Sequence, residues 1–301
     1  MEKIKFYIVA MRLRTLPLSL AGVLLGLMLA AADYHVHWTV FVFTLLTTVF
    51  LQILSNVSNE LGDAMHGTDG ADRQGPAYTL SKGYLSVGDF KVMVAVYVVL
   101  CILSGLAMIY FSFGTLLDLE PVLLMLLGAA AISGAMRYTL GRNPYGYRGL
   151  GDIYVFLFFG LVAVMGAYFV GSHTMHWRML LPAISMGAFS IGVLNVNNIR
   201  DMKTDAATRV TIPLKLGERN AKIYHTCLIV LGWTAMVIYV SLRIFDPWHY
   251  LFVLTLPLFV AHVSGVWKRT GKDLDPMLPM LVMSSFAFAL LAGLGFLVYL
   301  F

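Results

Sequence analysis

The sequence predicts an all-α integral membrane protein with nine transmembrane helices and a cytoplasmic N-terminus. Of its 301 residues, 59% are hydrophobic and only 12% are charged, whereas a soluble domain carries about 25% charged residues. Apolar runs recur with the length of about 20 residues that a helix needs to cross a bilayer. The short alternating segments of a membrane β-barrel are missing from the sequence, so the spans are expected to be helices.

The nine runs take up nearly the whole chain and leave no room for a folded domain outside the membrane. Residues 1–301 are therefore expected to form a single intramembrane domain. The predicted spans are approximately 14–32, 38–58, 90–112, 121–140, 151–171, 179–199, 223–242, 248–266 and 279–300.

The distribution of Lys and Arg predicts the orientation. With the N-terminus inside, 19 of the 21 Lys and Arg residues fall in inside segments, and only Arg178 and Arg243 lie outside. Such asymmetry is typical of a multi-pass protein of the cytoplasmic membrane. It also accounts for the net charge of +5 without a nucleic-acid partner, and for Arg137, Arg219 and Lys222 we favour this purely topological role.

The first span could be mistaken for a signal peptide, since a basic start and an apolar run precede Ala30, Ala31 and Ala32. The run from Thr15 to Ala32 is 18 residues long, which exceeds a typical signal core. We expect an uncleaved first helix. Cys101 and Cys227 both lie in apolar runs, and no His or Cys spacing resembles a zinc site.

Two inside connections, about 59–89 and 200–222, are long, whereas the outside connections are short. Long connections in a compact protein are usually functional or disordered. These two carry nearly all the carboxylates that face the cytoplasm, so we expect the active-site loops on that side.

Two stripes of oxygen ligands mark these connections. Asn197, Asp201 and Asp205 are spaced i, i+4, i+8, and Asn59 and Asp63 repeat the i, i+4 spacing before Asp69. On a helix each such step turns by only ~40°, so each stripe lies on one face.

Carboxylates ~5 Å apart repel by ~3 kcal/mol at an effective dielectric of 20, so the stripes need cations if they meet. Hard oxygen ligands select Mg²⁺ or Mn²⁺, and Mg²⁺ favours phosphate as a further ligand. The alternative is a set of solvated acids at helix ends, but two stripes on one side of the membrane favour a diphosphate site. We assign catalytic roles to Asp63, Asp201 and Asp205.

Basic and aromatic residues surround the stripes. Arg73, Arg142, Arg148, Arg209 and Lys215 could neutralise diphosphate oxygens, although all also satisfy the topological rule. The segment from Tyr138 to Asp152 contains Tyr138, Tyr145, Tyr147 and the two arginines. Aromatic faces stabilise cations such as an allylic carbocation. A membrane aromatic belt is the alternative, but the Gly and Pro content indicates a shaped loop. We expect Tyr145, Tyr147, Arg148 and Asp152 to belong to the substrate site.

The two motifs, Asn-x₃-Asp-x₅-Asp at 59–69 and Asn-x₃-Asp-x₃-Asp at 197–205, resemble the signatures of the UbiA superfamily of intramembrane prenyltransferases. The likeness is sharpest to the branch that prenylates 1,4-dihydroxy-2-naphthoate in menaquinone synthesis, through segments 12–17, 52–56, 67–76, 138–152 and 197–201. It implies nine helices around a central cavity and a polyprenyl diphosphate donor. It also implies two Mg²⁺ ions held by Asn59, Asp63, Asp69, Asn197, Asp201 and Asp205, and diphosphate contacts from Arg73, Tyr138 and Arg142.

The chain departs from the family pattern in two places. Glu60 stands where Asp is frequent. After Asp205, Arg209 and Lys215 replace the usual Lys and Arg with one residue fewer between them, which leaves open which of the two contacts phosphate.

The sequence therefore predicts transfer of a polyprenyl group to 1,4-dihydroxy-2-naphthoate with loss of CO₂ and diphosphate. One alternative is a sister prenyltransferase acting on 4-hydroxybenzoate, homogentisate or haem, which the Tyr138–Asp152 segment disfavours. The other is a transporter, which would place its ionisable groups near the bilayer midplane rather than at helix ends.

Overall fold

The structure is a computed structural model that describes residues 2–66 and 79–298. The described residues contain nine helical stretches long and apolar enough to cross a membrane, which confirms the predicted all-α membrane fold. These stretches are α2 (Leu16–Asp33), α3 (Trp38–Met65), α4 (Val87–Phe113), α5 (Leu119–Arg137), α6–η3–α7 (Gly151–Val155, Phe156–Gly166 and Ala167–Ser172), η4–α8 (Trp177–Met179 and Leu180–Arg200), α11 (Glu218–Ser241), η5–α12 (Pro247–Thr255 and Leu256–Lys268) and η6–α13 (Gly271–Leu274 and Met277–Leu297). The remaining elements are α1 (Glu2–Met11), η1 (Leu13–Thr15), η2 (Tyr145–Tyr147), α9 (Met202–Asp205) and α10 (Ile212–Leu216).

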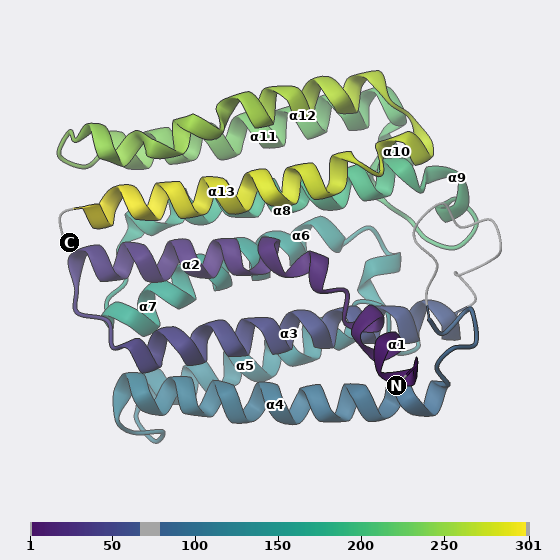
Figure 1. Ribbon diagram of the computed structural model, residues 1–301, viewed down its shortest axis with the longest axis horizontal. Coiled ribbons are helices and arrows are strands. Elements are labelled where there is room, and N and C mark those ends of the chain that lie inside the picture. The colour runs from purple at the N-terminus through teal and green to yellow at the C-terminus, as the bar shows by residue number, and fades with distance from the viewer. Residues whose placement is uncertain (1, 67–78, 299–301) are drawn as a thin grey trace.

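The long helices run side by side along the molecule, with α11 and α12 at one edge and α4 at the other (Figure 1). The short helices α1, α9 and α10 gather at one end, which we call the motif end. Helix α13 finishes at the opposite end (Figure 1). The carboxyl ends of α3 and α8 also lie at the motif end, so the fold brings both Asn/Asp stripes to the same end of the bundle.

Helix boundaries differ from the prediction at two places that affect the site. Helix α3 continues to Met65, beyond the predicted span end at residue 58, and Asn59 and Asp63 lie on its last turns, as the helical spacing predicted. Before the first span, α1 forms a separate helix at an angle to α2 (Figure 1). The chain turns at Arg12, whose φ of 51° is in the left-handed region and breaks the helical path.

The buried side chains form two main apolar clusters. The larger joins α2, α7, α8, α11 and α13 around residues such as Leu25, Phe189 and Phe288. The second joins α1, α3 and α4 around Leu54 and Phe90. Helix α5 contributes little to either, since only 11% of its membrane-spanning window is buried.

The fifth span is π-helical through its middle, η3. It packs closely against α8, where an added Cβ on Gly160 would lie 2.7 Å from the carbonyl oxygen of Ala183. An added Cβ on Gly187 would lie 2.7 Å from the ring of Phe156. Because these glycines allow the two backbones to approach, the fifth span is fixed against α8 and forms one wall of the interior cavity.

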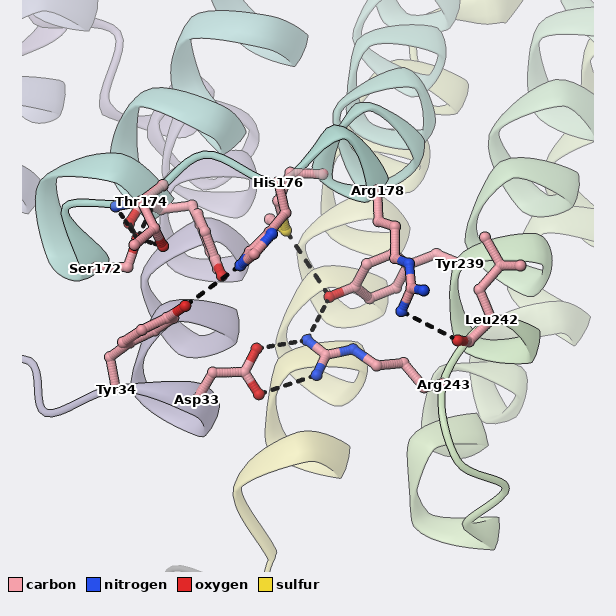
Figure 2. Close-up of polar contacts among 11 residues, drawn as sticks. Asp33, Tyr34, Ser172, Thr174, His176, Arg178, Tyr239, Leu242 and Arg243 are labelled. Carbon is pink, nitrogen blue, oxygen red and sulfur yellow. Dashed lines mark hydrogen bonds and ion pairs between the residues drawn. The ribbon is translucent and has the colours of Figure 1, made fainter.

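Polar side chains tie the helices together at the end opposite the motif end (Figure 2). Arg243 donates two hydrogen bonds to the Asp33 carboxylate, at 2.9 and 2.7 Å, and a third to the Tyr239 hydroxyl at 3.0 Å. The hydrogen bonds to Asp33 raise the pKa of Arg243. Arg178 donates to the Leu242 carbonyl at 3.4 Å. The two cations that the sequence assigns to the outside therefore both lie at this end.

Candidate active site

A cavity of about 430 Å³ lies between α3 and α5 on one side and α2, η3 and α8 on the other. At the motif end its wall is polar, with Arg12, Asn59, Asp63, Asn197 and Arg209. Away from this end, α5 and η3 line the cavity with apolar side chains that include Leu124, Leu127 and Val162. The facing part of α3 contributes mainly hydroxyl side chains, Thr44, Thr47 and Thr48. The cavity can therefore hold a charged group at one end and an apolar chain along the helices.

The end of α3 presents the first stripe to this cavity. The Asp63 side chain is buried and its Oδ1 accepts a hydrogen bond from the Tyr147 hydroxyl at 2.7 Å. The amide oxygen of Asn59 accepts a hydrogen bond from Thr139 at 3.3 Å. Both side chains of the described part of this stripe are thus held in place by residues that follow α5.

The second stripe keeps its predicted face although the helix is interrupted. Helix α8 ends at Arg200, and Asp201 leaves the helical conformation with φ −93° and ψ 6°. The backbone N–H of Asp201 still donates to Asn197, and that of Asp205 to Asp201, at 3.1 and 2.8 Å. Because these i to i−4 bonds persist, Asn197, Asp201 and Asp205 remain stacked.

Arg209 joins the two stripes. Its Nη2 lies 3.6 Å from Asp63 Oδ1, and its Nε lies 3.1 Å from Asp205 Oδ1. Its guanidinium carbon lies 5.1 Å from the centre of the Tyr147 ring. Burial lowers the pKa of Arg209, but its charge interactions with Asp63, Asp205, Tyr147 and Tyr138 together raise that pKa above its ordinary value. A positive charge therefore lies between a carboxylate from α3 and one from α9.

Arg200 binds the middle of the second stripe. Its Nε and Nη2 donate to the two carboxylate oxygens of Asp201 at 2.8 and 2.6 Å. Nη2 also donates to Asn197 Oδ1 at 2.8 Å, and Nη1 donates to Asp275 at 2.9 Å. Asp275 comes from the segment between η6 and α13, far away in the sequence.

The loop from Tyr138 to Asp152 folds over the polar end of the cavity. Tyr138 and Tyr145 line the cavity and pack edge to face, with ring centres 5.3 Å apart. Tyr145 stacks on Tyr154 at 3.7 Å, and its hydroxyl donates to the Gly134 carbonyl at 2.7 Å. Burial raises the pKa of Tyr138 to about 12. At neutral pH these tyrosines form an uncharged aromatic wall.

This loop also contacts the segment that carries Arg209. The backbone N–H of Val210 donates to the Tyr147 carbonyl at 3.0 Å. An added Cβ on Gly146 would lie 2.6 Å from the Tyr138 carbonyl oxygen, so only glycine fits there. The Gly and Pro content of the loop thus gives a shaped wall, as expected.

Several predicted site residues lie around the cavity without lining it. They are the substrate-site residues Arg142, Tyr147, Arg148, Asp152 and Lys215, and the catalytic residues Asp201 and Asp205. Arg142, Arg148 and Lys215 are exposed, and Lys215 Nζ would lie 3.4 Å from a Cβ added at Gly149. Asp152 accepts a hydrogen bond from Tyr224 at 2.8 Å and adjoins a small void next to Tyr138. Asp69 and Arg73 lie outside the described residues.

Sequence reasoning missed several residues of this region. Arg12 lines the cavity and contacts Glu60 at 3.4 Å. Glu60, where the chain departs from the family pattern, accepts hydrogen bonds from the Thr79 hydroxyl and the Leu80 N–H at 2.8 and 3.0 Å. Arg12 and Arg200 belong to segments already singled out, but Tyr154, Tyr224 and Asp275 carry no motif.

The oxygen donors at the motif end fit Mg²⁺ by their chemistry, because carboxylate and amide oxygens are its protein ligands. Within residues 2–66 and 79–298, no three His, Cys, Asp or Glu side chains group as a metal site. A site here would therefore draw on the amide oxygens of Asn59 and Asn197 as well. The carboxylates of Asp63 and Asp205 already share one cation, the Arg209 guanidinium.

Comparison with known proteins identifies the family of the chain. A profile of the UbiA prenyltransferase family matches residues 19–289. The 1,4-dihydroxy-2-naphthoate octaprenyltransferase of Escherichia coli (strain K12) is 38% identical over 275 residues, covering 90% of this chain and 87% of that protein. The protein of the same name from Haemophilus influenzae is 36% identical over 301 residues, covering 99% and 97%.

Solved structures share the fold. A UbiA homologue from Aeropyrum pernix K1 in its apo form superposes with a TM-score of 0.70 at 16% identity, covering 96% of this chain and 98% of that one. A UbiA homologue from Archaeoglobus fulgidus bound to GPP and Mg²⁺ gives 0.65 at 16% identity, covering 96% and 99%. Because the family profile spans most of the sequence and relatives above 30% identity cover nearly all of it, the chain belongs to the UbiA prenyltransferase family.

Proposed function

We propose that this transferase moves a polyprenyl group from polyprenyl diphosphate to 1,4-dihydroxy-2-naphthoate, with loss of CO₂ and diphosphate, to give the demethylmenaquinol of menaquinone biosynthesis. One observation carries the proposal. Asp63 and Asp205, from two distant helices, meet at Arg209 at the polar end of a long cavity. The naphthoate prenyltransferases that resemble this chain over most of its length support the choice of acceptor.

The diphosphate is proposed to bind at the polar end. Two Mg²⁺ ions would be held there by Asn59, Asp63, Asp69, Asn197, Asp201 and Asp205. When bound, Mg²⁺ supplies positive charge that stabilises the leaving diphosphate. Arg12 and Arg209 are cations on the cavity wall at this end. Arg73, Arg142 and Lys215 are proposed to meet diphosphate oxygens as the substrates enter, and Arg148 is proposed to help select the acceptor. Arg forks suit phosphate oxygens especially well.

The prenyl chain is proposed to lie in the apolar part of the cavity. The wall follows α3 from Asp63 back to Thr44, a distance of roughly 28 Å at the rise of an α-helix. Apolar side chains from α5 and η3, including Leu127 and Val162, line this part. Burial of an isoprenoid chain here is favourable and leaves its reactive end at the polar mouth.

The acceptor is proposed to bind against the aromatic wall formed by Tyr138 and Tyr145, with Tyr147 beside the diphosphate. Tyr145 is held by its stack on Tyr154, and stacking on such a ring contributes ~1 kcal/mol beyond burial. The Tyr147 hydroxyl bonds to Asp63, so it links the acceptor wall to the first stripe. Asp152 is proposed to belong to the same substrate site, where it accepts a hydrogen bond from the Tyr224 hydroxyl.

The reaction balances without an oxidant or reductant. The allylic C–O bond breaks and diphosphate leaves with the electron pair. The electron-rich ring forms the new C–C bond with the allylic carbon, and the bond between the ring and the carboxylate breaks so that CO₂ leaves its electron pair in the ring. The faces of Tyr138 and Tyr145 can stabilise the allylic cation, and exclusion of water protects it.

The motif end is proposed to face the cytoplasm of a cytoplasmic membrane. The positive-inside rule supports this orientation. Of the 21 Lys and Arg residues, only Arg178 and Arg243 are placed on the opposite side of the membrane.

The test is turnover by purified protein in lipid nanodiscs with 1,4-dihydroxy-2-naphthoate, a polyprenyl diphosphate and Mg²⁺. Prenylated product, CO₂ and diphosphate should appear in equal amounts, and a chelator should stop all three. Movement of a substrate into sealed vesicles without diphosphate release would instead indicate a transporter.

A further inference from the structure

Arg200 is a nearly buried cation at the motif end. Its side chain is only 4% exposed, yet four of its N–H contacts go to acceptors within 3.0 Å. Two go to Asp201, one to Asn197 and one to Asp275. One guanidinium therefore fixes two members of the second stripe and is itself held by a residue from another part of the chain.

This arrangement orients the second stripe and still leaves oxygen lone pairs that can bind a metal ion. A guanidinium that binds a carboxylate side on uses one lone pair of each oxygen, so each Asp201 oxygen keeps another. The amide oxygen of Asn197 likewise keeps one lone pair. Asp201 and Asn197 can thus bind a further cation, but only from the direction that Arg200 leaves open.

The charge balance of this group depends on Asp275. Arg200 carries one positive charge and faces two carboxylates, Asp201 and Asp275, so the three together carry one negative charge. Without Asp275, Arg200 and Asp201 would neutralise each other. The second stripe would then attract a divalent cation less strongly.

The backbone of Asp275 is the C-cap of η6, where its N–H donates to the Lys272 carbonyl, but its carboxylate is not used for this bond. The N-cap of α13 is Pro276, and no side-chain cap bond is formed there. The Asp275 side chain is 38% exposed, and an ion pair this exposed usually contributes little to stability. Its contact with a nearly buried arginine therefore points to an effect on the site.

We propose that Asp275 is a positioning residue of the active site, which acts through Arg200 to orient Asp201 and Asn197 and to keep the second stripe negative enough to bind a divalent cation. This inference rests on the proposed function, because it assigns that cation to prenyl transfer.

The test compares Asp275→Asn with Asp273→Asn, a matched change in the same loop. Asp273 is exposed, and none of the hydrogen bonds of Arg200 reaches it. Two quantities are measured on each purified variant: the Mg²⁺ concentration that half-saturates turnover, and direct Mn²⁺ binding by electron paramagnetic resonance without substrates. Melting temperature is recorded without metal.

Asp275→Asn should raise both metal constants by about tenfold, the usual effect of losing a residue that supports metal ligands. Asp273→Asn should change neither, and Asp275→Glu should restore metal binding to within about threefold. If Asp275→Asn is recovered unfolded, Asp275→Ser is measured in its place with the same expectation.

Equal metal constants for the two Asn variants would overturn the inference, as would a lower melting temperature with unchanged Mn²⁺ binding. Failure of the proposed function is a different result. In that case the wild-type protein would form no prenylated product, while the Mn²⁺ measurement would still decide the role of Asp275.

Discussion

Arginine–carboxylate pairs set the electrostatics of the site at the scale of single residues. Arg209 lies between Asp63 and Asp205, and Arg200 holds Asp201. The spacing of Asn and Asp in the sequence identified these carboxylates, because i, i+4 spacing alone places side chains on one face. The spacing could not show that Arg200 binds the neighbouring Asp201 carboxylate or that Asp275 binds Arg200. These two contacts depend on tertiary packing.

The first prediction concerns the two carboxylates that share Arg209. Asp63→Asn and Asp205→Asn should each lower turnover by about a hundredfold or more, because charge stabilisation at the leaving group is lost. Asp118→Asn, at the opposite end of α5, is the control and should leave turnover unchanged. Initial rates across a Mg²⁺ titration decide it, and near-normal turnover of either variant would contradict the assignment.

The second prediction concerns the link between the aromatic loop and the first stripe. Tyr147→Phe removes the hydroxyl that donates to Asp63 but keeps the ring beside Arg209. A hydrogen bond to a charged group contributes ~1.5–3 kcal/mol, so kcat/KM should fall by roughly tenfold to a hundredfold. Tyr84→Phe, on an exposed ring that stacks on Phe6, serves as the control. If kcat/KM of Tyr147→Phe equals that of the Tyr84→Phe control, the assignment of Tyr147 to the active site is wrong.

At the scale of elements, the hydropathy pattern predicted the nine spans but not how they end. Helix α3 continues to Met65 because Asn59, Glu60 and Asp63 all find partners at the motif end, and a hydropathy average reads such polar residues as loop. The π-helical η3 was also beyond prediction. Its close approach to α8 at Gly160 could not be predicted either, because it is a property of two helices together.

The third prediction tests where the prenyl chain lies. Gly128 on α5 lines the cavity, and a Cβ added there would meet no atom within 4 Å. Gly128→Phe should therefore fill the apolar part of the cavity without disturbing the helix packing. Transfer from long polyprenyl diphosphates should fall at least tenfold, while transfer from geranyl diphosphate continues.

Gly105→Phe on α4 is the matched control, since its added Cβ would meet only Thr47 at 3.9 Å and Gly105 does not line the cavity. Rates measured with a series of donors of increasing length give the answer. Uniform loss across all chain lengths would show that the prenyl chain lies elsewhere.

At the scale of the whole molecule, charge and polarity divide the bundle into two different ends. The motif end holds both stripes and the aromatic loop, and the opposite end is tied by Asp33 and Arg243 (Figure 2). The count of Lys and Arg predicted this division because it sums over every connection. It could not predict the cavity itself, whose volume depends on how α5 stands apart from α6–η3–α7.

The fourth prediction concerns orientation. In a Cys227→Ser background, a cysteine at Lys82 should be protected from a membrane-impermeant thiol reagent in intact cells, and one at Met175 should react. Both positions are exposed and lie in connections on opposite sides of the predicted membrane. Permeabilised cells provide the control, in which both should react. Labelling at position 82 from outside would place the active site on the other face.

The most direct measurement of the central claim is a competition among acceptors. Purified protein receives one polyprenyl diphosphate, Mg²⁺, and equal amounts of 1,4-dihydroxy-2-naphthoate, 4-hydroxybenzoate and homogentisate, and the products are identified by mass spectrometry. The proposed function predicts prenylated, decarboxylated naphthoquinol as the dominant product, and none when Mg²⁺ is chelated. Dominant prenylation of 4-hydroxybenzoate or homogentisate, or an unchanged product yield without a divalent cation, would contradict it.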